Sequence, residues 1–297
     1  MKPDFYSLGL IGFPLEHSVS PCLHKANLNV LGLAGEYKLY EVPAMPNGKE
    51  RIVDLLNRLR NEEIAGLNVT IPHKKTVIPF LDNLTSPARD IGAVNTIYLN
   101  DGRLFGDNTD APGFSSDFEN VMKETGYQWK TDSSNNEHHA LVIGAGGSAC
   151  AVVYALAKKG WRVTIAARRL QQARELAHRY RGGDSESLIS DTTLNKSEIN
   201  GLEQQISLIV NTTPIGMWPN IDDSPWPENL NLPNNAIVYD LIYNPSETKL
   251  VKDARAAGLI AVTGLGMLIE QAALAFERWT GIPANRDAMR NGVIDYI

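Results

Sequence analysis

Short apolar runs alternate with amphipathic stretches through the first part of the chain. The runs LGLIG, YKLYEV and GLNVTI have the length and residue types of strands, and they start at Leu8, Tyr37 and Gly66. Residues 21–31 and 48–60 have the apolar spacing of helices with one buried face. Strands that alternate with helices in this way predict a largely parallel α/β sheet.

A second pattern of the same kind begins at Ala140. The run ALVIGAGGSACAVVYALAKKGWRVTIAAR predicts a strand, a glycine-rich turn, an apolar helix and a further strand. Later strand-like runs, SLIVNTT, AIVYDLI and LIAVTG, are followed by a strongly amphipathic stretch that starts at Gly264. Because domains cluster at roughly 100 to 150 residues, the 297-residue chain predicts two α/β domains, and one unusually large domain is the alternative.

The composition narrows the possible function classes. Hydrophobic residues make up 43% and charged residues 21% of the chain, which is enough apolar surface for a core without disulfides or metal. A net charge of -6 without a basic cluster predicts that neither nucleic acid nor a membrane is a partner. The two cysteines, Cys22 and Cys150, are isolated, no metal-ligand spacing occurs, and no apolar run reaches about 18 residues. These features predict a cytoplasmic protein with no metal site.

A candidate cofactor site lies in the turn after the first strand of the second pattern. Gly144, Gly146 and Ala149 form a G-x-G-x-x-A pattern between a strand and a helix, which is typical of dinucleotide binding. The glycines allow a tight turn and a close approach of the backbone to a pyrophosphate at the helix N-terminus. A glycine-rich turn without a ligand is the alternative, but the order of strand, turn, helix and strand favours a cofactor.

The next strand of this pattern ends in Arg168 and Arg169, where a carboxylate would hold the ribose of NAD. Arginine suits a 2′-phosphate, so the expected cofactor is NADP, although both arginines would also suit the start of a solvated helix. Thr213 closes a later strand at the edge where such sheets bind ligands. An ordinary turn explains Thr213 equally well.

Polar residues gather beside apolar runs in three segments of the first 110 residues. These segments are SVSPCLH, NVTIPHK, and GAVNT together with GDNTD. Lys74 follows the strand that contains Asn68 and Thr70, and a lysine beside a carboxylate such as Asp110 can protonate the alkoxide that forms when a carbonyl is reduced. Taken singly, each charge also suits a solvated surface.

Together these motifs have the order and approximate spacing of the shikimate dehydrogenase family. The same family carries G-A-G-G-S-A, a D-x-x-Y-x-P-x-x-T segment matched from Asp240, and G-L-G-M-L-x-x-Q matched from Gly264. The chain therefore resembles this family over nearly its whole length. The resemblance implies a reversible, NADPH-dependent reduction of 3-dehydroshikimate to shikimate, in the biosynthesis of chorismate and the aromatic amino acids.

The resemblance also implies roles for individual residues. Lys74 and Asp110 match the catalytic pair, and neighbouring Lys75 is the main rival for the lysine role. The residues that match substrate-binding positions are Ser18, Ser20, Asn68, Thr70, Asn95, Tyr243 and Gln271. The residues that match cofactor-binding positions are Gly144, Ala145, Gly146, Gly147, Ser148, Arg168, Arg169, Thr213, Leu241, Gly264 and Met267.

The expected architecture is a substrate-binding and catalytic α/β domain, residues 1–110 completed by 264–297, and a Rossmann-like, doubly wound NADP-binding domain, residues 111–263. The catalytic pair is expected to face the nicotinamide across a cleft between the two domains. The chain reads Ala167-Arg168-Arg169, with Gln172 beyond, where many members carry Asn-Arg-Thr and a further arginine. This departure predicts weaker or redirected contacts to the 2′-phosphate.

Two rival functions remain at this point. A quinate or quinate/shikimate dehydrogenase, with dual substrate or NAD use, shares nearly every motif, but Ser20 favours shikimate because quinate-preferring relatives often carry threonine there. A non-catalytic NADP-binding regulator would have lost the proton-transfer pair, which is present. The expected partner is the small-molecule substrate, and the expected assembly is a monomer or a homodimer.

Overall fold

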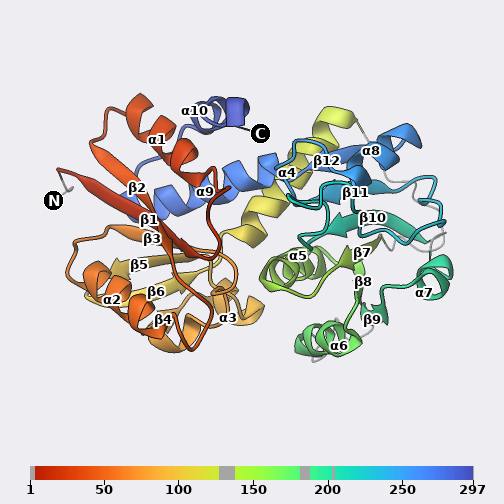
Figure 1. The fold of residues 1–297 in the computed structure, drawn as a ribbon, viewed down its shortest axis with the longest axis horizontal. Coiled ribbons are helices and arrows are strands. Elements are labelled where there is room, and N and C mark those ends of the chain that lie inside the picture. The colour runs from red at the N-terminus through yellow and green to blue at the C-terminus, as the bar shows by residue number, and fades with distance from the viewer. Residues whose placement is uncertain (1–3, 127–137, 181–187, 203–204, 297) are drawn as a thin grey trace. The chain divides into compact units, whose positions relative to one another are not determined.

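A computed structural model describes residues 4–126, 138–180, 188–202 and 205–296 (Figure 1). The chain divides into two compact units. Unit 1 contains the residues up to Gly113 together with Ile269–Tyr296, and unit 2 contains Phe114–Leu268. Within the described residues, no helix is both long enough and apolar enough to cross a membrane.

Unit 1 contains a six-stranded sheet with helices packed against it. Its strands are β1 (Tyr6–Gly12), β2 (Gly35–Glu41), β3 (Gly66–Val69), β4 (Asn83–Leu84), β5 (Thr96–Asn100) and β6 (Arg103–Asp107). Its helical elements are α1 (Ser20–Val30), α2 (Lys49–Arg60), η1 (Ile78–Phe80), α3 (Ser86–Ile91), α10 (Arg286–Asn291) and η2 (Ile294–Tyr296). Helices α1 and α10 lie side by side (Figure 1). Two longer helices, α4 (Asp110–Thr125) and α9 (Leu265–Thr280), each contribute residues to both units.

The strand order of this sheet is β2-β1-β3-β5-β6-β4. Strands β2, β1 and β3 run parallel, as the alternation of strands and helices predicted, but β5 runs antiparallel to both β3 and β6. Asp101 and Gly102 adopt positive φ angles in the tight turn between β5 and β6. This hairpin was not predicted because only one face of its short strands is apolar, with Ile97 and Leu104 in the core, whereas the buried Thr96 and Asp107 are polar. The sheet of unit 1 is therefore mixed.

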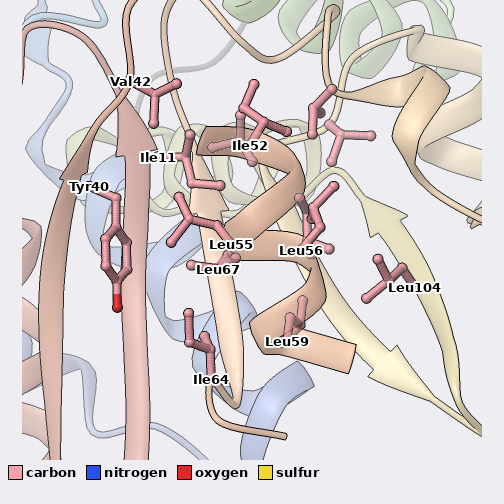
Figure 2. Packing of buried hydrophobic residues seen from close by; sticks show 14 of the residues in the cluster. Ile11, Tyr40, Val42, Ile52, Leu55, Leu56, Leu59, Ile64, Leu67 and Leu104 are labelled. Carbon is pink, nitrogen blue, oxygen red and sulfur yellow. The ribbon is translucent and has the colours of Figure 1, made fainter. Parts of the chain in front are cut away.

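One hydrophobic cluster of unit 1 lies between the sheet and α2. The buried side chains of α2 share one face of the helix, and Figure 2 shows them packed against strand residues such as Ile11 and Leu67: Ile52, Leu55, Leu56 and Leu59. Their spacing is the one that predicted the helix. Tyr40 of β2 belongs to the same cluster, so the alternation of side chains along β2 turns Tyr37 to the opposite face, toward α1 and α9.

Unit 2 is built around a second six-stranded sheet. Its strands are β7 (His139–Ile143), β8 (Arg162–Ala167), β9 (Ile189–Thr193), β10 (Ile206–Asn211), β11 (Ile237–Asp240) and β12 (Ala261–Thr263). Its own helices are α5 (Gly147–Lys158), α6 (Leu170–Arg179), α7 (Lys196–Asn200) and α8 (Lys249–Ala256). The order β12-β11-β10-β7-β8-β9 is entirely parallel. It is the strand order of a doubly wound dinucleotide-binding sheet, with its topological switch point between β7 and β10.

Candidate active site

The topology of unit 1 brings four chain segments to one edge of its sheet. Strands β1 and β3 are parallel, and β6 runs in the same direction because two antiparallel pairings separate it from β3. The carboxyl ends of these strands and the amino end of β5 therefore meet at one edge. The segments that leave or enter the sheet there carry Ser18, Lys74, Asp110 and Asn95.

Lys74 and Asp110 form an ion pair at this edge, with Lys74 Nζ 2.7 Å from Asp110 Oδ2. Their side chains are only 12% and 6% exposed, so water screens the pair poorly. Asp110 is the first residue of α4, where the helix dipole stabilises a negative charge. Asp110 is the only hydrogen-bond partner of the Lys74 ammonium within the described residues, which leaves further N–H donors for a ligand. Lys75, in contrast, is exposed.

Asn95 holds the other carboxylate oxygen, because its Nδ2 donates to Asp110 Oδ1 at 2.8 Å. The backbone N–H of Thr109 donates to Asn95 Oδ1 at 2.8 Å. A backbone N–H can only donate, so this contact fixes which end of the amide faces Asp110. Gln271 of α9 accepts a longer hydrogen bond from Asn95 Nδ2, at 3.4 Å. Gly113 allows α9 to come this close, since a Cβ there would lie 2.9 Å from the backbone nitrogen of Gln271.

Two serines lie in the segment after β1. Ser20 is the first residue of α1, and its backbone N–H lies 3.4 Å from Ser18 Oγ. Both side chains are partly exposed, so their hydroxyl groups can donate to a ligand. Thr70 follows β3 and packs against Gly12, where a Cβ would lie 2.3 Å from Thr70 Cγ2. Glycine at position 12 therefore lets these two segments approach each other.

The glycine-rich turn of unit 2 has a geometry that fits a dinucleotide. Gly144 has a φ of 113°, and a Cβ there would lie 2.4 Å from Thr212 Oγ1, so only glycine fits without strain. Gly146 precedes the first turn of α5, and a Cβ on it would meet nothing within 4 Å. The N–H groups at the start of α5 are therefore open to an anion. Ala149 is fully buried, as close packing of α5 on the sheet requires.

Arg168 and Arg169 follow β8 at the same edge, and both are exposed. Neither side chain forms a hydrogen bond or an ion pair with another residue in the part of the chain that the structure describes. Their guanidinium groups are thus available to a phosphate, while no carboxylate stands at this position to repel it.

Asp240 organises the adjoining ends of β10 and β11. Its carboxylate accepts from Asn211 Nδ2 at 2.9 Å, from Thr248 Oγ1 at 2.7 Å and from the backbone N–H of Ile242 at 3.1 Å. Burial raises the pKa of Asp240 to about 6, although these three hydrogen bonds act in the opposite direction. Asn211 Oδ1 in turn accepts from Thr213 Oγ1 at 2.7 Å. Thr213 is thereby fixed beside the glycine-rich turn.

The remaining residues predicted in unit 2 follow β11 and β12. Gly264 packs directly on Leu241, since a Cβ on the glycine would lie 2.0 Å from the Leu241 carbonyl oxygen. Met267 is 6% exposed in the first turn of α9, so packing accounts for much of its surface. Tyr243 is half-buried in the loop after β11. It lies in unit 2, whereas the other residues predicted to bind the substrate lie in unit 1.

Three family models match successive parts of the chain. They are the shikimate dehydrogenase substrate binding domain over residues 10–97, shikimate / quinate 5-dehydrogenase over residues 128–213, and the shikimate 5'-dehydrogenase C-terminal domain over residues 264–292. The shikimate dehydrogenase (NADP(+)) of Geobacillus kaustophilus is 41% identical over 288 residues, which are 97% of each chain. The chain belongs to the shikimate dehydrogenase family. The family assignment made from the ordered motifs is thus confirmed.

Solved structures of the family share the fold. A shikimate dehydrogenase in complex with NADP+ has a TM-score of 0.84 and 35% identity, with 100% of this chain and 98% of that chain covered. The Thermus thermophilus enzyme in complex with NADP(H) and shikimate has a TM-score of 0.80 and 33% identity, with coverage of 98% and 100%. The quinate dehydrogenase of Corynebacterium glutamicum in complex with NAD has a TM-score of 0.83 at 29% identity, with coverage of 98% and 99%. The predicted two-domain α/β fold with a Rossmann-like domain is confirmed.

The geometry of this family member places the predicted residues in two groups. Hydrogen bonds join Lys74, Asp110, Asn95 and Gln271 in unit 1. Close contacts join the glycine-rich turn to Thr213, and Leu241 to Gly264, in unit 2. Sequence reasoning missed the residues that hold these groups in place: Tyr37, Thr96, Thr109 and Asp240. Thr96, Thr109 and Asp240 carried a signal, because all three lie inside family motifs, whereas Tyr37 carried none.

Proposed function

We propose that this chain is an NADP-dependent shikimate dehydrogenase, which reduces 3-dehydroshikimate to shikimate reversibly. The observation that carries the proposal is the poorly exposed pair of Lys74 and Asp110, held by Asn95 and Gln271. A reduction of a carbonyl needs a proton donor where the oxygen becomes negative. The pair supplies such a donor in a fixed position.

Lys74 donates the proton to the carbonyl oxygen during reduction, and it takes the proton back from the hydroxyl group in the reverse direction. Asp110 holds the ammonium in place and accepts a hydrogen bond from a neighbouring hydroxyl of the ring. Both ends of its carboxylate are already anchored, by Lys74 and by Asn95, so it keeps its orientation as the substrate enters. Bound NADPH would supply the hydride.

The ring is held by groups suited to its carboxylate and its hydroxyls. Ser18 and Ser20 donate to the carboxylate, and Tyr243 assists them. The side chains that offer donors and acceptors to the hydroxyls are those of Asn68, Thr70, Asn95 and Gln271. In unit 2, Arg168 and Arg169 bind the 2′-phosphate, and the start of α5 binds the pyrophosphate. The cofactor is completed by contacts with Thr213, Leu241, Gly264 and Met267.

We also propose the domain roles, the cellular location and the assembly of the enzyme. Residues 1–110 with 264–297 act as the substrate-binding and catalytic domain, and residues 111–263 act as the NADP-binding domain. Cys22 and Cys150 are free thiols, which suits a reducing cytoplasm. The assembly is a monomer or a homodimer.

The test is a comparison of substrates and cofactors. Oxidation of NADPH is followed with 3-dehydroshikimate, beside NADH, and the reverse reaction is followed with shikimate and with quinate. We expect the highest kcat/KM for the shikimate pair with NADP. Efficient quinate turnover with NAD, and none of shikimate with NADP, would overturn the proposal in favour of the quinate alternative.

A further inference from the structure

A continuous chain of hydrogen bonds runs through unit 1 from β2 to Lys74. Tyr37 Oη donates to Asn68 Oδ1 at 2.8 Å, and Asn68 Nδ2 lies 3.3 Å from Thr96 Oγ1. Thr96 Oγ1 donates to Asn95 Oδ1 at 3.0 Å. Asn95 then donates to Asp110, whose other oxygen accepts from Lys74. Tyr37 thus lies at the far end of a chain that finishes on the catalytic pair.

The donor and acceptor roles along this chain of hydrogen bonds are fixed by a group that can only accept. Asn68 Nδ2 lies 3.1 Å from the backbone carbonyl oxygen of Asn95, which can only accept. Asn68 must therefore turn its amide oxygen to Tyr37, and the tyrosine hydroxyl must donate. Both amide hydrogens of Asn68 then have protein partners, and the side chain is 6% exposed. Asn68 holds Asn95 in place through these bonds.

Tyr37 reaches Asn68 across an intervening strand. Tyr37 is paired with Leu8 of β1, and Asn68 is paired with Leu10 of the same strand. Two strand spacings of roughly 4.8 Å separate β2 from β3, so only a long side chain can bridge them. The Tyr37 ring is itself fixed by His24, which stacks on it with a centroid distance of 4.3 Å and an interplanar angle of 5°.

We propose that Tyr37 is a positioning residue for the reaction, and that Asn68 relays its effect to Asn95 and Asp110. This inference rests on the proposed function. The hydroxyl of Tyr37 sets the orientation of Asn68, and Asn68 sets that of Asn95. The orientation of Asp110 and its ion pair with Lys74 follow from the position of Asn95.

The test compares two tyrosines of the same strand. Tyr37→Phe removes the donor but keeps the ring that stacks on His24. Tyr40→Phe is the matched control, because the Tyr40 hydroxyl is also buried but has no hydrogen-bond partner within the described residues. We expect Tyr37→Phe to lower kcat about three- to ten-fold, with an unchanged KM for NADPH, as the loss of one positioning hydrogen bond implies. Tyr40→Phe should stay within about two-fold of the wild-type kcat.

A second measurement separates positioning from a loss of stability. In an Asp110→Asn background the chain no longer ends on a lysine-carboxylate pair, so Tyr37→Phe should change the residual kcat by less than about 1.5-fold. A similar fall in both backgrounds, or equal kcat values for Tyr37→Phe and Tyr40→Phe, would overturn the inference. An active wild-type enzyme in the same assay keeps the proposed function separate from this result. A wild-type protein inactive with shikimate and NADP would remove both.

Discussion

The proposed ligand-binding edges of the two units differ in which groups of the chain form them. In unit 1 the edge consists of side chains, and Asn95, Asp110 and Lys74 are each held by another side chain or a backbone group. In unit 2 the edge consists mainly of backbone: a turn at Gly144 with a positive φ and the open N-terminus of α5. Under the proposed function, unit 1 therefore supplies the reacting side chains and unit 2 the cofactor site.

This difference predicts how each edge responds to substitution. An edge made of side chains loses a specific chemical step when one group is removed, while its fold persists. An edge made of backbone tolerates changes of side chain but not the addition of a Cβ at Gly144, where no space exists. Substitutions in the two units should therefore separate turnover from cofactor binding.

The largest expected effect belongs to Lys74. Lys74→Ala removes the proposed proton donor, and we expect kcat to fall about 10³-fold while the Kd for NADPH stays within about two-fold of the wild-type value. Steady-state kinetics and a fluorescence titration with NADPH measure the two quantities. Lys75→Ala is the control, since Lys75 is exposed, and its kcat should be unchanged. Wild-type turnover in Lys74→Ala would show that the proton comes from elsewhere.

A smaller effect, on cofactor binding instead of turnover, is expected at Gly144. Gly144→Ala forces a Cβ against Thr212 and a non-glycine residue into a φ of 113°, which should raise the Kd for NADPH about 100-fold. Gly160→Ala is the matched control, because Gly160 also has a positive φ, of 76°, but has open space around it. It should lower the melting temperature without changing the Kd. Equal Kd values for the two variants would contradict a backbone-built cofactor site.

The elements with clear periodicity could be predicted from the sequence. Helices α1 and α2 have regular apolar spacing because one face of each is buried. Strands β1 and β3 are short, mostly apolar runs because both of their faces are buried. Strand β9 was missed because its residues, ISDTT, are mostly polar and half-buried. The hairpin of β5 and β6 was missed for a related reason, since Thr96 turns a hydroxyl into the polar chain.

The residues of the candidate site likewise divide into those that the sequence predicted and those that it did not. The motifs predicted Lys74 and Asp110, and the structure places them in contact. Nothing in the sequence predicted Tyr37, because a tyrosine in a strand is typical of packing and its hydrogen bond depends on the order of β2, β1 and β3. Contacts across strands depend on register, which local patterns do not contain.

The preference of unit 2 for one cofactor over the other is expected to depend on Arg168. In the proposed cofactor site, Arg168 and Arg169 are the residues expected to contact the 2′-phosphate and so to favour NADP over NAD. Arg168→Ala should raise the KM for NADPH about ten-fold and leave the KM for NADH within about two-fold of its wild-type value. Arg179→Ala, at the far end of α6, is the control for a general loss of positive charge. An equal rise for both cofactors would contradict a contact with the 2′-phosphate.

The smallest expected effect concerns stability, and here the two units should respond to pH with opposite signs. In unit 1, burial lowers the pKa of His24 to about 3, so the folded state excludes a proton that the unfolded state binds below its ordinary pKa of about 6.5. The stability due to neutral His24 is lost as the pH falls, by about 2 kcal/mol between pH 7 and 5.

In unit 2, burial raises the pKa of Asp240 to about 6, so the folded state holds a proton that the unfolded state has released. Lowering the pH over the same interval should therefore stabilise unit 2 by about 1 kcal/mol.

Two variants separate these contributions. His24→Phe keeps an aromatic ring against Tyr37 but cannot be protonated, so its melting temperature should fall less than that of the wild type between pH 7 and 5. Asp240→Asn removes the opposing group, so its melting temperature should fall more steeply over the same range. Calorimetry of the three proteins at pH 5, 6 and 7 measures both slopes. Parallel plots of melting temperature against pH for the three proteins would mean that neither group titrates in this range. The burial of His24 and of Asp240 would then have no effect on how stability depends on pH.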